Sequence, residues 1–299
     1  VGSLLKENDV LRSAGARRVS PRTVPMLMPN AAAAAISIQY GARGGTYTPV
    51  SACSSGAEAI ALGARLIRTG EADVVLAGGT EAAITPITVA GFVQARSLSN
   101  YAGDPANASR PFAVDRGGFV LGEGAGVVVL ESAAHATARG ARIRAVLAGA
   151  GVSADAHHMT APAPDGRGQT AAMRNALRQA GLAPGAVGHI NAHATGTVIG
   201  DISEARAIAD VFGAGAVTTA PKASLGHLFG AAGAVEAILT VLSVELGVVP
   251  PTRNLAAAGL DPLMELDVAT TRRDTRALSA LSNSFGFGGQ NVSLLFTAS

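Results

Sequence analysis

The 299-residue sequence predicts an α/β fold of two similar halves, residues 1–141 and 142–299. Short β-branched or aromatic runs alternate with apolar helical patterns along the chain. In each half a predicted strand ends in a turn of small or polar residues, and a helix follows. Glycine is abundant, with 37 residues, and aromatic residues are scarce, which favours close packing of backbone segments. We therefore expect two α/β halves related as an internal repeat, although no letter-level repeat is visible.

The composition bounds the classes of protein that the chain can belong to. Apolar residues make up 48% and charged residues 15%, which is typical of a globular protein with a large core. A net charge of +2 gives no indication of nucleic-acid binding. A single cysteine argues against an oxidising compartment, so we expect a cytoplasmic protein. The most apolar stretch, residues 231–250, contains Glu236 and Glu245 and predicts a core helix, not a membrane span.

Cys53, the single cysteine, lies in a predicted strand–turn–helix segment. Residues 47–50 form a run typical of a buried strand, residues 51–56 are small, and an apolar helix pattern continues to Gly70. A thiol in such a turn lies at a helix N-terminus, whose dipole favours the thiolate. The segment alone leaves two roles open for Cys53, a nucleophile or a small buried hydrophobe.

The other predicted elements continue the alternation. A strand over residues 73–77 follows the Cys53 helix, so the two strands should pair in parallel as a β-α-β unit. Asp201 and Glu204 are spaced as a capping box. The alanine-rich helix over residues 30–40 should be tightly packed. Further helices are expected over residues 90–98, 133–139, 170–180, 201–212 and 234–246, and strands at the end of residues 119–130 and over 143–150, 188–192, 278–282 and 292–296.

Three further stretches contain side chains or backbone suited to catalysis. His193 follows a predicted strand, where α/β folds place their sites, and Lys222 and His227 precede the long apolar helix. Residues 283–289 form a glycine-rich loop. Taken singly, each has a structural explanation, since a lone histidine in an apolar segment is usually a core residue and a glycine-rich loop is usually a turn.

Taken together with the Cys53 segment, these motifs resemble the β-ketoacyl-acyl-carrier-protein synthases of the elongating, Cys-His-His class. The resemblance implies a thiolase-like fold, in which mixed sheets and helices form five layers, α-β-α-β-α. It also implies that about the first quarter of the family's chain is missing here, so the native polypeptide should be heavier than 29.6 kDa. The matching residues are 52–56, 193–197 with Gly200, Asp201 and Glu204, Lys222 with 226–227, and 285–289, with support from 109–112 and 155–160.

The resemblance implies a decarboxylative Claisen condensation. Cys53, with a pKa lowered by the helix terminus, would hold an acyl chain as a thioester. His193 and His227, both neutral, would donate hydrogen bonds to the malonyl thioester and stabilise the enolate formed when carbon dioxide leaves. The backbone N–H groups of Cys53 and Phe287 would form the oxyanion hole. Lys222 and Glu204 would form a buried ion pair beside the histidines.

The same resemblance implies the binding partners. Substrates would arrive on the phosphopantetheine arm of an acyl carrier protein, with no metal or other cofactor, and the enzyme would be a homodimer or a heterodimer with a chain-length factor. No nucleic acid or membrane partner is expected. The implied contacts are Thr195, Thr197 and Thr160 for the arm, Phe92, Phe285 and Phe287 for the acyl pocket or gate, and Arg17, Arg18 and Arg96 for the carrier protein.

Several alternatives remain open on the sequence. The nearest is the catalytic ketosynthase of a type II polyketide synthase, and a Cys-His hydrolase or an inert acyl-binding scaffold would use the same residues differently. A thiolase would need a second cysteine, and initiating ketosynthases carry Asn in place of His227. Gln290, Gly117 and residues 100–103 depart from the family pattern and leave chain length and pathway open.

Overall fold

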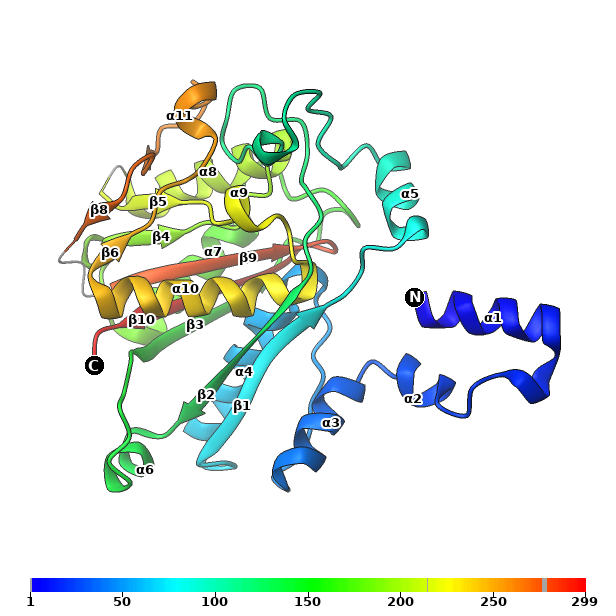
Figure 1. The fold of residues 1–299 in the computed structure, drawn as a ribbon. Helices are drawn as coiled ribbons and strands as arrows, with labels where there is room; N and C mark the ends of the chain where they lie inside the picture. Colours follow the sequence, from blue (N-terminus) through cyan, green and yellow to red (C-terminus); the bar gives the residue numbers. More distant parts are fainter. Residues whose placement is uncertain (1, 214, 276–278) are drawn as a thin grey trace.

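The computed structural model describes residues 2–213, 215–275 and 279–299 and arranges them around two main sheets (Figure 1). The larger sheet has six strands in the order β3-β10-β9-β4-β5-β7. Its first three strands are antiparallel, and β9, β4, β5 and β7 run parallel to one another, so the sheet is mixed as expected. The strands are β3 (Val146–Ala154), β4 (His189–Asn191), β5 (Val217–Thr219), β7 (Asp267–Val268), β9 (Ser279–Gly286) and β10 (Gln290–Thr297).

The smaller sheet is an antiparallel pair, β1 (Val74–Glu81) and β2 (Gly124–Glu131). Glycines bring its strands and their neighbours unusually close: a methyl group added at Gly78 would lie 2.0 Å from the carbonyl oxygen of Gly126. A short third pair, β6 (Val248–Val249) and β8 (Arg273–Asp274), follows the long C-terminal helix.

Two helices, α4 (Ser55–Arg68) and α10 (Ala232–Leu246), lie between the two main sheets. Their apolar residues share one core cluster with strands of both sheets. Gly56 allows the helices to meet, since a methyl group there would lie 2.9 Å from the Ala234 nitrogen. The window Phe229–Leu246 is long and apolar enough to cross a membrane, but half of it is buried in the protein, as predicted for a core helix.

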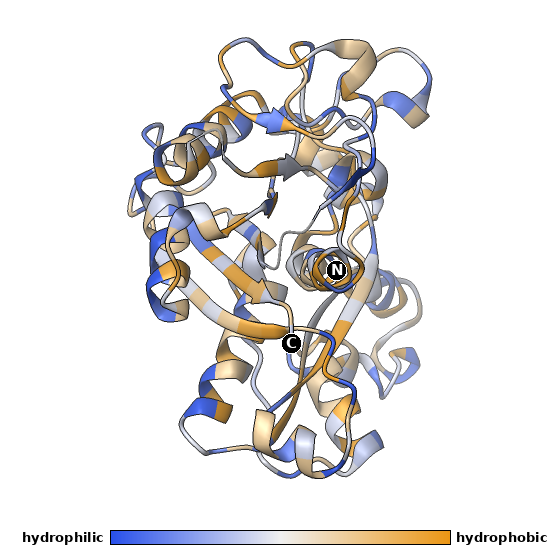
Figure 2. Cartoon of the chain, turned by 90° about the vertical axis from the view of Figure 1, so that its left-hand side faces the viewer, coloured by the Kyte–Doolittle hydropathy of each residue, from blue (hydrophilic) through white to orange (hydrophobic). Residues whose placement is uncertain are grey.

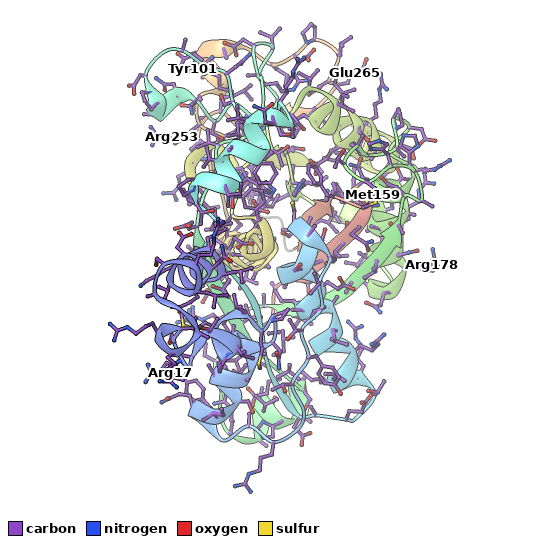
Figure 3. The ribbon with its side chains drawn as sticks, turned by 90° about the vertical axis from the view of Figure 1, so that its right-hand side faces the viewer. Arg17, Tyr101, Met159, Arg178, Arg253 and Glu265 are labelled. Atoms are coloured by element: carbon purple, nitrogen blue, oxygen red, sulfur yellow. The ribbon has the colours of Figure 1, made fainter. Side chains whose placement is uncertain are left out.

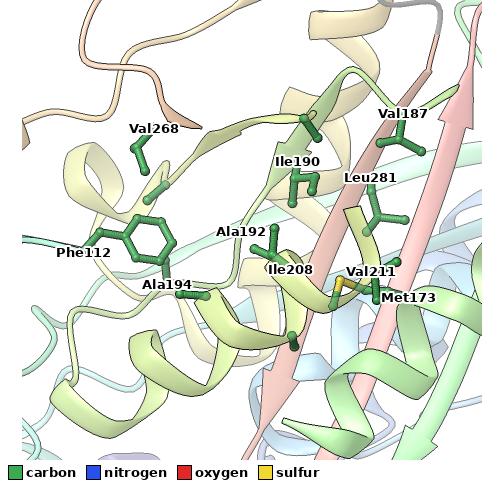
Figure 4. Close-up of a cluster of buried hydrophobic side chains, with 14 of the residues drawn as sticks. Phe112, Met173, Val187, Ile190, Ala192, Ala194, Ile208, Val211, Val268 and Leu281 are labelled. Atoms are coloured by element: carbon green, nitrogen blue, oxygen red, sulfur yellow. The ribbon is translucent and has the colours of Figure 1, made fainter. Parts of the chain in front are cut away.

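On the other face of the six-stranded sheet, α7 (Arg167–Ala180) and α8 (Val198–Phe212) cover a second cluster (Figure 4). The side chains of β9 alternate between the clusters, with Ala280 facing α4 and α10 and Leu281 facing α7 and α8. Figure 2 shows apolar residues along the strands and polar residues on the outer helices. Both faces of the sheet are therefore buried, and nearly every residue of β9 and β10 is inaccessible to solvent.

The N-terminal helices α1 (Gly2–Ala14), α2 (Thr23–Leu27) and α3 (Ala31–Tyr40) extend away from the body and contain no buried residue (Figure 1). Helix α3 ends at a left-handed Gly41, as expected, but the prediction of tight packing is wrong because Ile38 is 82% exposed. The predicted strand over residues 47–50 is also wrong, since these residues form no strand and Val50 is 77% exposed.

The predicted parallel β-α-β unit is also wrong, because residues 47–50 form no strand with which β1 could pair. A strand needs a hydrogen-bonded neighbour, and within the described residues β1 pairs with β2 alone. The other predicted elements are confirmed with shifted ends, except that Leu278 lies outside the described residues. The remaining helices are α5 (Pro86–Gln94), α6 (Ala133–Ala138), α9 (Lys222–Leu225) and α11 (Leu255–Ala258), with 3-10 turns η1 (Ala16–Arg18), η2 (Ala52–Ser54), η3 (Pro105–Asn107), η4 (Pro184–Ala186) and η5 (Phe229–Ala231).

Candidate active site

Parallel strands bring the candidate residues to one edge of the six-stranded sheet. His193 follows the carboxyl end of β4, Lys222 follows that of β5, and Phe287 follows that of β9. Because adjacent parallel strands end at the same edge, the three segments meet there. The N-terminus of α4 approaches the same edge and carries the fourth segment, with Cys53.

Cys53 lies in η2, a tight turn directly before α4. Ala52, the preceding residue, has a φ of +51°, a left-handed conformation that non-glycine residues rarely adopt outside functional sites. The Ser54 hydroxyl ties the turn to the β9–β10 hairpin by donating to the carbonyls of Ser284 and Gln290. The turn is therefore fixed against the sheet, and Cys53 is 8% exposed.

His227 reaches Cys53 from the turn after α9. Its Nε2 lies 3.1 Å from the Cys53 Sγ, the distance of a hydrogen bond to sulfur. The His227 backbone is held by two hydrogen bonds, from its N–H to the Val120 carbonyl and from the Gly122 N–H to its own carbonyl. The Nδ1 atom of His227 is buried and has no hydrogen-bond partner within the described residues.

His193 lies beside His227, with ring centroids 5.4 Å apart and planes at 86°. Glu204 holds the His193 segment, because its carboxylate accepts hydrogen bonds from the backbone N–H groups of His193 (2.8 Å) and Ala194 (2.7 Å). The capping-box prediction is therefore wrong: α8 begins after Thr197, and Glu204 binds backbone outside the helix. Burial raises the pKa of Glu204 to about 7, and the two backbone N–H donors act in the opposite direction.

Lys222 is buried and forms its ion pair with Glu236 of α10, at 2.5 Å, and not with Glu204 as predicted. Both side chains are almost fully buried, so each would be an uncompensated charge without the other. Burial raises the pKa of Glu236, and the Lys222 charge opposes that rise. The two carboxylates therefore have different roles: Glu204 orders the His193 backbone, and Glu236 pairs with the lysine.

Both histidines are neutral at neutral pH. Burial lowers the pKa of His193 and of His227 well below the usual value, and the positive charge of Lys222 lowers both further. This agrees with the expectation of two neutral imidazoles. A neutral ring can accept a proton through one nitrogen or donate a hydrogen bond through it, depending on the tautomer.

The prediction of a lowered thiol pKa is wrong. Burial raises the pKa of Cys53 to about 11, and this outweighs the opposing effects of the Lys222 charge and of the backbone N–H groups of Phe287 and Cys53. Both N–H groups nevertheless form hydrogen bonds toward the Cys53 sulfur. They are the two groups that were expected to form the oxyanion hole. The resting pair is therefore a neutral thiol beside a neutral imidazole.

A single cavity of about 1830 Å³ surrounds these groups and extends to the outer face of the β1–β2 sheet. Lys222 lies behind its wall, and Arg17 and Arg18 lie away from it on η1, where Figure 3 shows Arg17 beside the N-terminal helices. The cavity therefore brings together most of the predicted site. Its lining includes Cys53, His193, His227, Glu204, Thr160, Thr195, Thr197, Phe92, Phe285, Phe287 and Arg96.

Two family models match the chain, "Beta-ketoacyl synthase, N-terminal domain" over residues 1–136 and "Beta-ketoacyl synthase, C-terminal domain" over residues 144–256. The chain belongs to the β-ketoacyl synthase family. It is 49% identical to the 3-oxoacyl-[acyl-carrier-protein] synthase 2 of Mycobacterium tuberculosis over 291 residues, covering 96% of this chain and 69% of the relative. It is 48% identical to the mitochondrial 3-oxoacyl-[acyl-carrier-protein] synthase of Arabidopsis thaliana, covering 94% of this chain and 62% of that protein.

Solved β-ketoacyl synthases share the fold. A β-ketoacyl synthase from Burkholderia phymatum superposes with a TM-score of 0.94 at 35% identity, covering all of this chain and 72% of that one. A type II polyketide ketosynthase bound to a hexaketide, in complex with its acyl-carrier protein, gives a TM-score of 0.93 at 31% identity, covering 98% of this chain and 74% of that one. The chain thus has the thiolase-like fold and spans about seven tenths of the length of most of these relatives.

One residue that holds the loops beside the cavity was not predicted from the sequence. Asp155 connects the loop around Thr160 to the β9–β10 hairpin. Its carboxylate accepts from the Asn291 side chain of β10 (2.7 Å) and the Ala163 N–H (3.0 Å), and its own N–H donates to the Gly289 carbonyl (2.9 Å). The Gly288 N–H also donates to the carbonyl of Met159, which Figure 3 shows beside the β9–β10 hairpin. The sequence offered one signal for Asp155: it is a charged residue at the start of the segment that contains Thr160.

Two aromatic rings were also missed. Phe119 and Phe229 pack against the His227 ring, and Phe229 also stacks on the predicted pocket residue Phe92. Nothing in the periodicity distinguishes these residues from core residues. The short sequence distance from His227 to Phe229 was the one available signal.

Proposed function

We propose that this chain catalyses the condensation of an acyl group, held on Cys53, with malonyl-acyl-carrier protein to give 3-ketoacyl-acyl-carrier protein and carbon dioxide. The observation that carries the proposal is the 3.1 Å contact between Cys53 Sγ and His227 Nε2, with the His193 ring beside it in one cavity. A sulfur nucleophile and two neutral imidazoles are the groups that acyl transfer and enolate stabilisation require.

In the first half-reaction, the Cys53 sulfur attacks the acyl thioester of the carrier protein. Because the thiol is protonated at rest, His227 Nε2 accepts its proton during the attack and passes it to the departing phosphopantetheine thiolate. The N–H groups of Cys53 and Phe287 stabilise the oxyanion that forms on the acyl carbonyl. The products are the acyl-cysteine and the free thiol of the carrier protein.

In the second half-reaction, the two imidazoles donate hydrogen bonds to the thioester carbonyl of the malonyl group. Loss of carbon dioxide leaves an enolate, whose carbon attacks the acyl-cysteine; the Cys53 thiolate then leaves and takes up a proton. His227 can accept in one step and donate in the next because its unpaired Nδ1 fixes neither tautomer. Neutral rings stabilise the enolate oxygen without protonating the carbon nucleophile.

The carrier protein is the proposed partner. A solved ketosynthase of the same fold is bound to its acyl-carrier protein, and Thr160, Thr195 and Thr197 line a cavity able to hold the phosphopantetheine arm. Arg96 lines the same cavity, and Arg17 and Arg18 are exposed, so these cations are the proposed contacts for an acidic carrier protein. We further propose that each subunit consists of two halves, residues 1–141 and 142–299. The protein would be a cytoplasmic dimer that uses no metal or additional cofactor.

A role in polyketide synthesis is the second candidate. Two solved neighbours are ketosynthases with their chain length factors, at 33% and 30% identity. Curated relatives that share 45–49% identity with this chain are named 3-oxoacyl-[acyl-carrier-protein] synthase, one of them as putative, which favours fatty acid elongation. Purification with a second, cysteine-lacking subunit of the same fold would favour the polyketide assignment.

The test is incubation of the protein with acyl- and malonyl-acyl-carrier protein, with products identified by mass spectrometry. We expect 3-ketoacyl product from the wild type, no acyl-enzyme from Cys53→Ala, and loss of malonyl decarboxylation in His193→Ala and His227→Ala. His135→Ala is the matched control, because His135 lies exposed on α6 outside the cavity. Free fatty acid would identify a hydrolase instead, and no product with intact Cys53 would identify a scaffold.

A further inference from the structure

The Phe229 ring forms one wall against the catalytic imidazole. Its centroid lies 4.6 Å from that of His227, with the planes inclined at 42°. Phe229 also stacks on a second ring, that of Phe92, with centroids 5.2 Å apart and planes at 11°. Phe119 completes the cluster with edge-to-face contacts to Phe229 (5.6 Å) and to His227 (5.4 Å). His227 is thus flanked by Phe119 and Phe229 in addition to the His193 ring, and Phe229 in turn packs against Phe92.

The backbone of Phe229 is strained. Its φ of +44° is a left-handed conformation that costs a non-glycine residue roughly 1–2 kcal/mol and is an outlier for a bulky side chain. Glycine or asparagine would adopt it more easily. The conformation of the turn therefore does not explain why this position carries a phenylalanine. What Phe229 supplies is the ring, and the ring contacts His227.

Within the described residues, the His227 ring has one polar contact, between its Nε2 atom and the Cys53 sulfur. In serine-protease triads a carboxylate hydrogen-bonded to the distal nitrogen fixes the imidazole plane. Here the Nδ1 atom of His227 is buried without a partner in the described parts of the chain, and Nε2 contacts the Cys53 sulfur alone. Packing must therefore restrict rotation of the ring about its bond to Cβ, and the rings that pack against it are Phe119, Phe229 and the second imidazole, His193.

We propose that Phe229 is a positioning residue for His227, whose ring keeps Nε2 aimed at the reacting sulfur and thioester. This inference rests on the catalytic role proposed for His227. Phe229 lines the cavity and is only half-buried, so removing its ring changes the catalytic edge of the cavity more than the core. Misplacement of a catalytic group by about 1 Å can reduce a rate by about a hundredfold.

The test compares Phe229→Gly with Phe229→Tyr. Glycine suits the left-handed backbone and removes the ring, whereas tyrosine keeps the ring. We expect the Gly variant to lose on the order of tenfold or more in the kcat of malonyl decarboxylation, with its KM and Tm close to wild type. The Tyr variant should stay within about twofold of wild type. A merely structural role would lower Tm and kcat together.

A second measurement is independent of catalysis. With 13C-labelled histidine, the His227 Cε1 resonance, assigned from His227→Ala, should be a single narrow line in wild type and Phe229→Tyr. In Phe229→Gly it should broaden or split as the ring samples several orientations. One narrow line in the Gly variant, or equal kinetic losses in the Gly and Tyr variants, would overturn the proposal. An inactive wild type with the expected broadening would refute the proposed function and leave the positioning of His227 supported.

Discussion

The Cys53 sulfur is subject to two opposing influences. The start of α4, the nearby Lys222 charge and two backbone N–H groups all favour the thiolate, whereas burial favours the thiol. Burial is the larger effect, and it raises the pKa of Cys53 to about 11. The sulfur is therefore stored in its less reactive form, and it needs His227 to remove the proton when a thioester is present.

This balance predicts how Cys53 reacts with alkylating agents. A thiol with a pKa near 11 reacts about tenfold faster for each unit of pH from about 8 to 10, because the thiolate is the nucleophile. The rate of iodoacetamide labelling, followed by intact mass, should rise throughout this range without a plateau. Cys53 is the only cysteine, so the labelled site is unambiguous. A plateau at or below pH 8 would show that the helix N-terminus lowers the pKa of Cys53 by more than burial raises it.

At the scale of elements, glycines set the distance between layers. β3 and α7 approach so closely that a methyl group on Gly151 would lie 1.9 Å from the Ala172 carbonyl oxygen, and one on Gly149 would lie 2.1 Å from that of Ala176. The colliding atoms belong to the backbone of α7, which cannot turn away as a side chain would. Close contacts between strands and helices therefore explain part of the high glycine content of the sequence.

Gly151→Ala should therefore force α7 away from β3 and lower the free energy of unfolding by about 1–3 kcal/mol. Gly185→Ala is the control, because Gly185 lies in an exposed turn with no atom within 4 Å of the added methyl and without a positive φ. Urea unfolding of both variants measures the difference. Equal stability of the two variants would contradict the close contact between β3 and α7.

Local patterns predicted the helices well and the strand pairing poorly. The apolar period of 3.6 residues is a local property, and it was sufficient for α4 and α7, whereas α10 was predicted from the length of its apolar stretch. Pairing is not local, and residues 47–50 have strand-like composition but no neighbouring strand among the described residues. The Asp201 and Glu204 spacing misled in the same way, because both carboxylates bind backbone that lies outside α8.

At the scale of the molecule, the site depends on a convergence of distant segments. Cys53 and His227 are 174 residues apart, and the sequence identified them through motif resemblance, since spacing does not reveal contact. The wrong partner for Lys222 has the same origin: Glu204 and Glu236 are both buried carboxylates near the site, and the fold alone decides which lies at 2.5 Å. Residue type could be predicted, whereas distance required the packed sheets.

The buried titratable groups also give the whole molecule a pH-dependent stability with opposing contributions. Burial lowers the pKa of His189 to about 4, so the folded state binds fewer protons than the unfolded state between about pH 4 and 6.5. The contribution of His189 to the free energy of unfolding is fully present above pH 6.5 and is lost as the pH falls toward 4. The stability difference between wild type and His189→Gln should therefore fall by about 3 kcal/mol from pH 6.5 to 4, measured by urea unfolding. No change in that difference would mean that His189 titrates normally.

Glu204 should act with the opposite sign. Its folded pKa of about 7 exceeds the ordinary value of 4.5, so the folded state binds more protons between these pH values, and stability is lost as pH rises through 7. The difference in unfolding free energy between wild type and Glu204→Gln should decrease by up to about 3 kcal/mol from pH 4.5 to 7.5. The amide of this variant cannot titrate, but it also offers fewer acceptor atoms to the His193 and Ala194 N–H groups, which lowers stability by a pH-independent amount. Unfolding curves at several pH values separate the two effects, because only the titration changes the slope. A difference that grows with pH would show that the backbone N–H donors outweigh burial at Glu204.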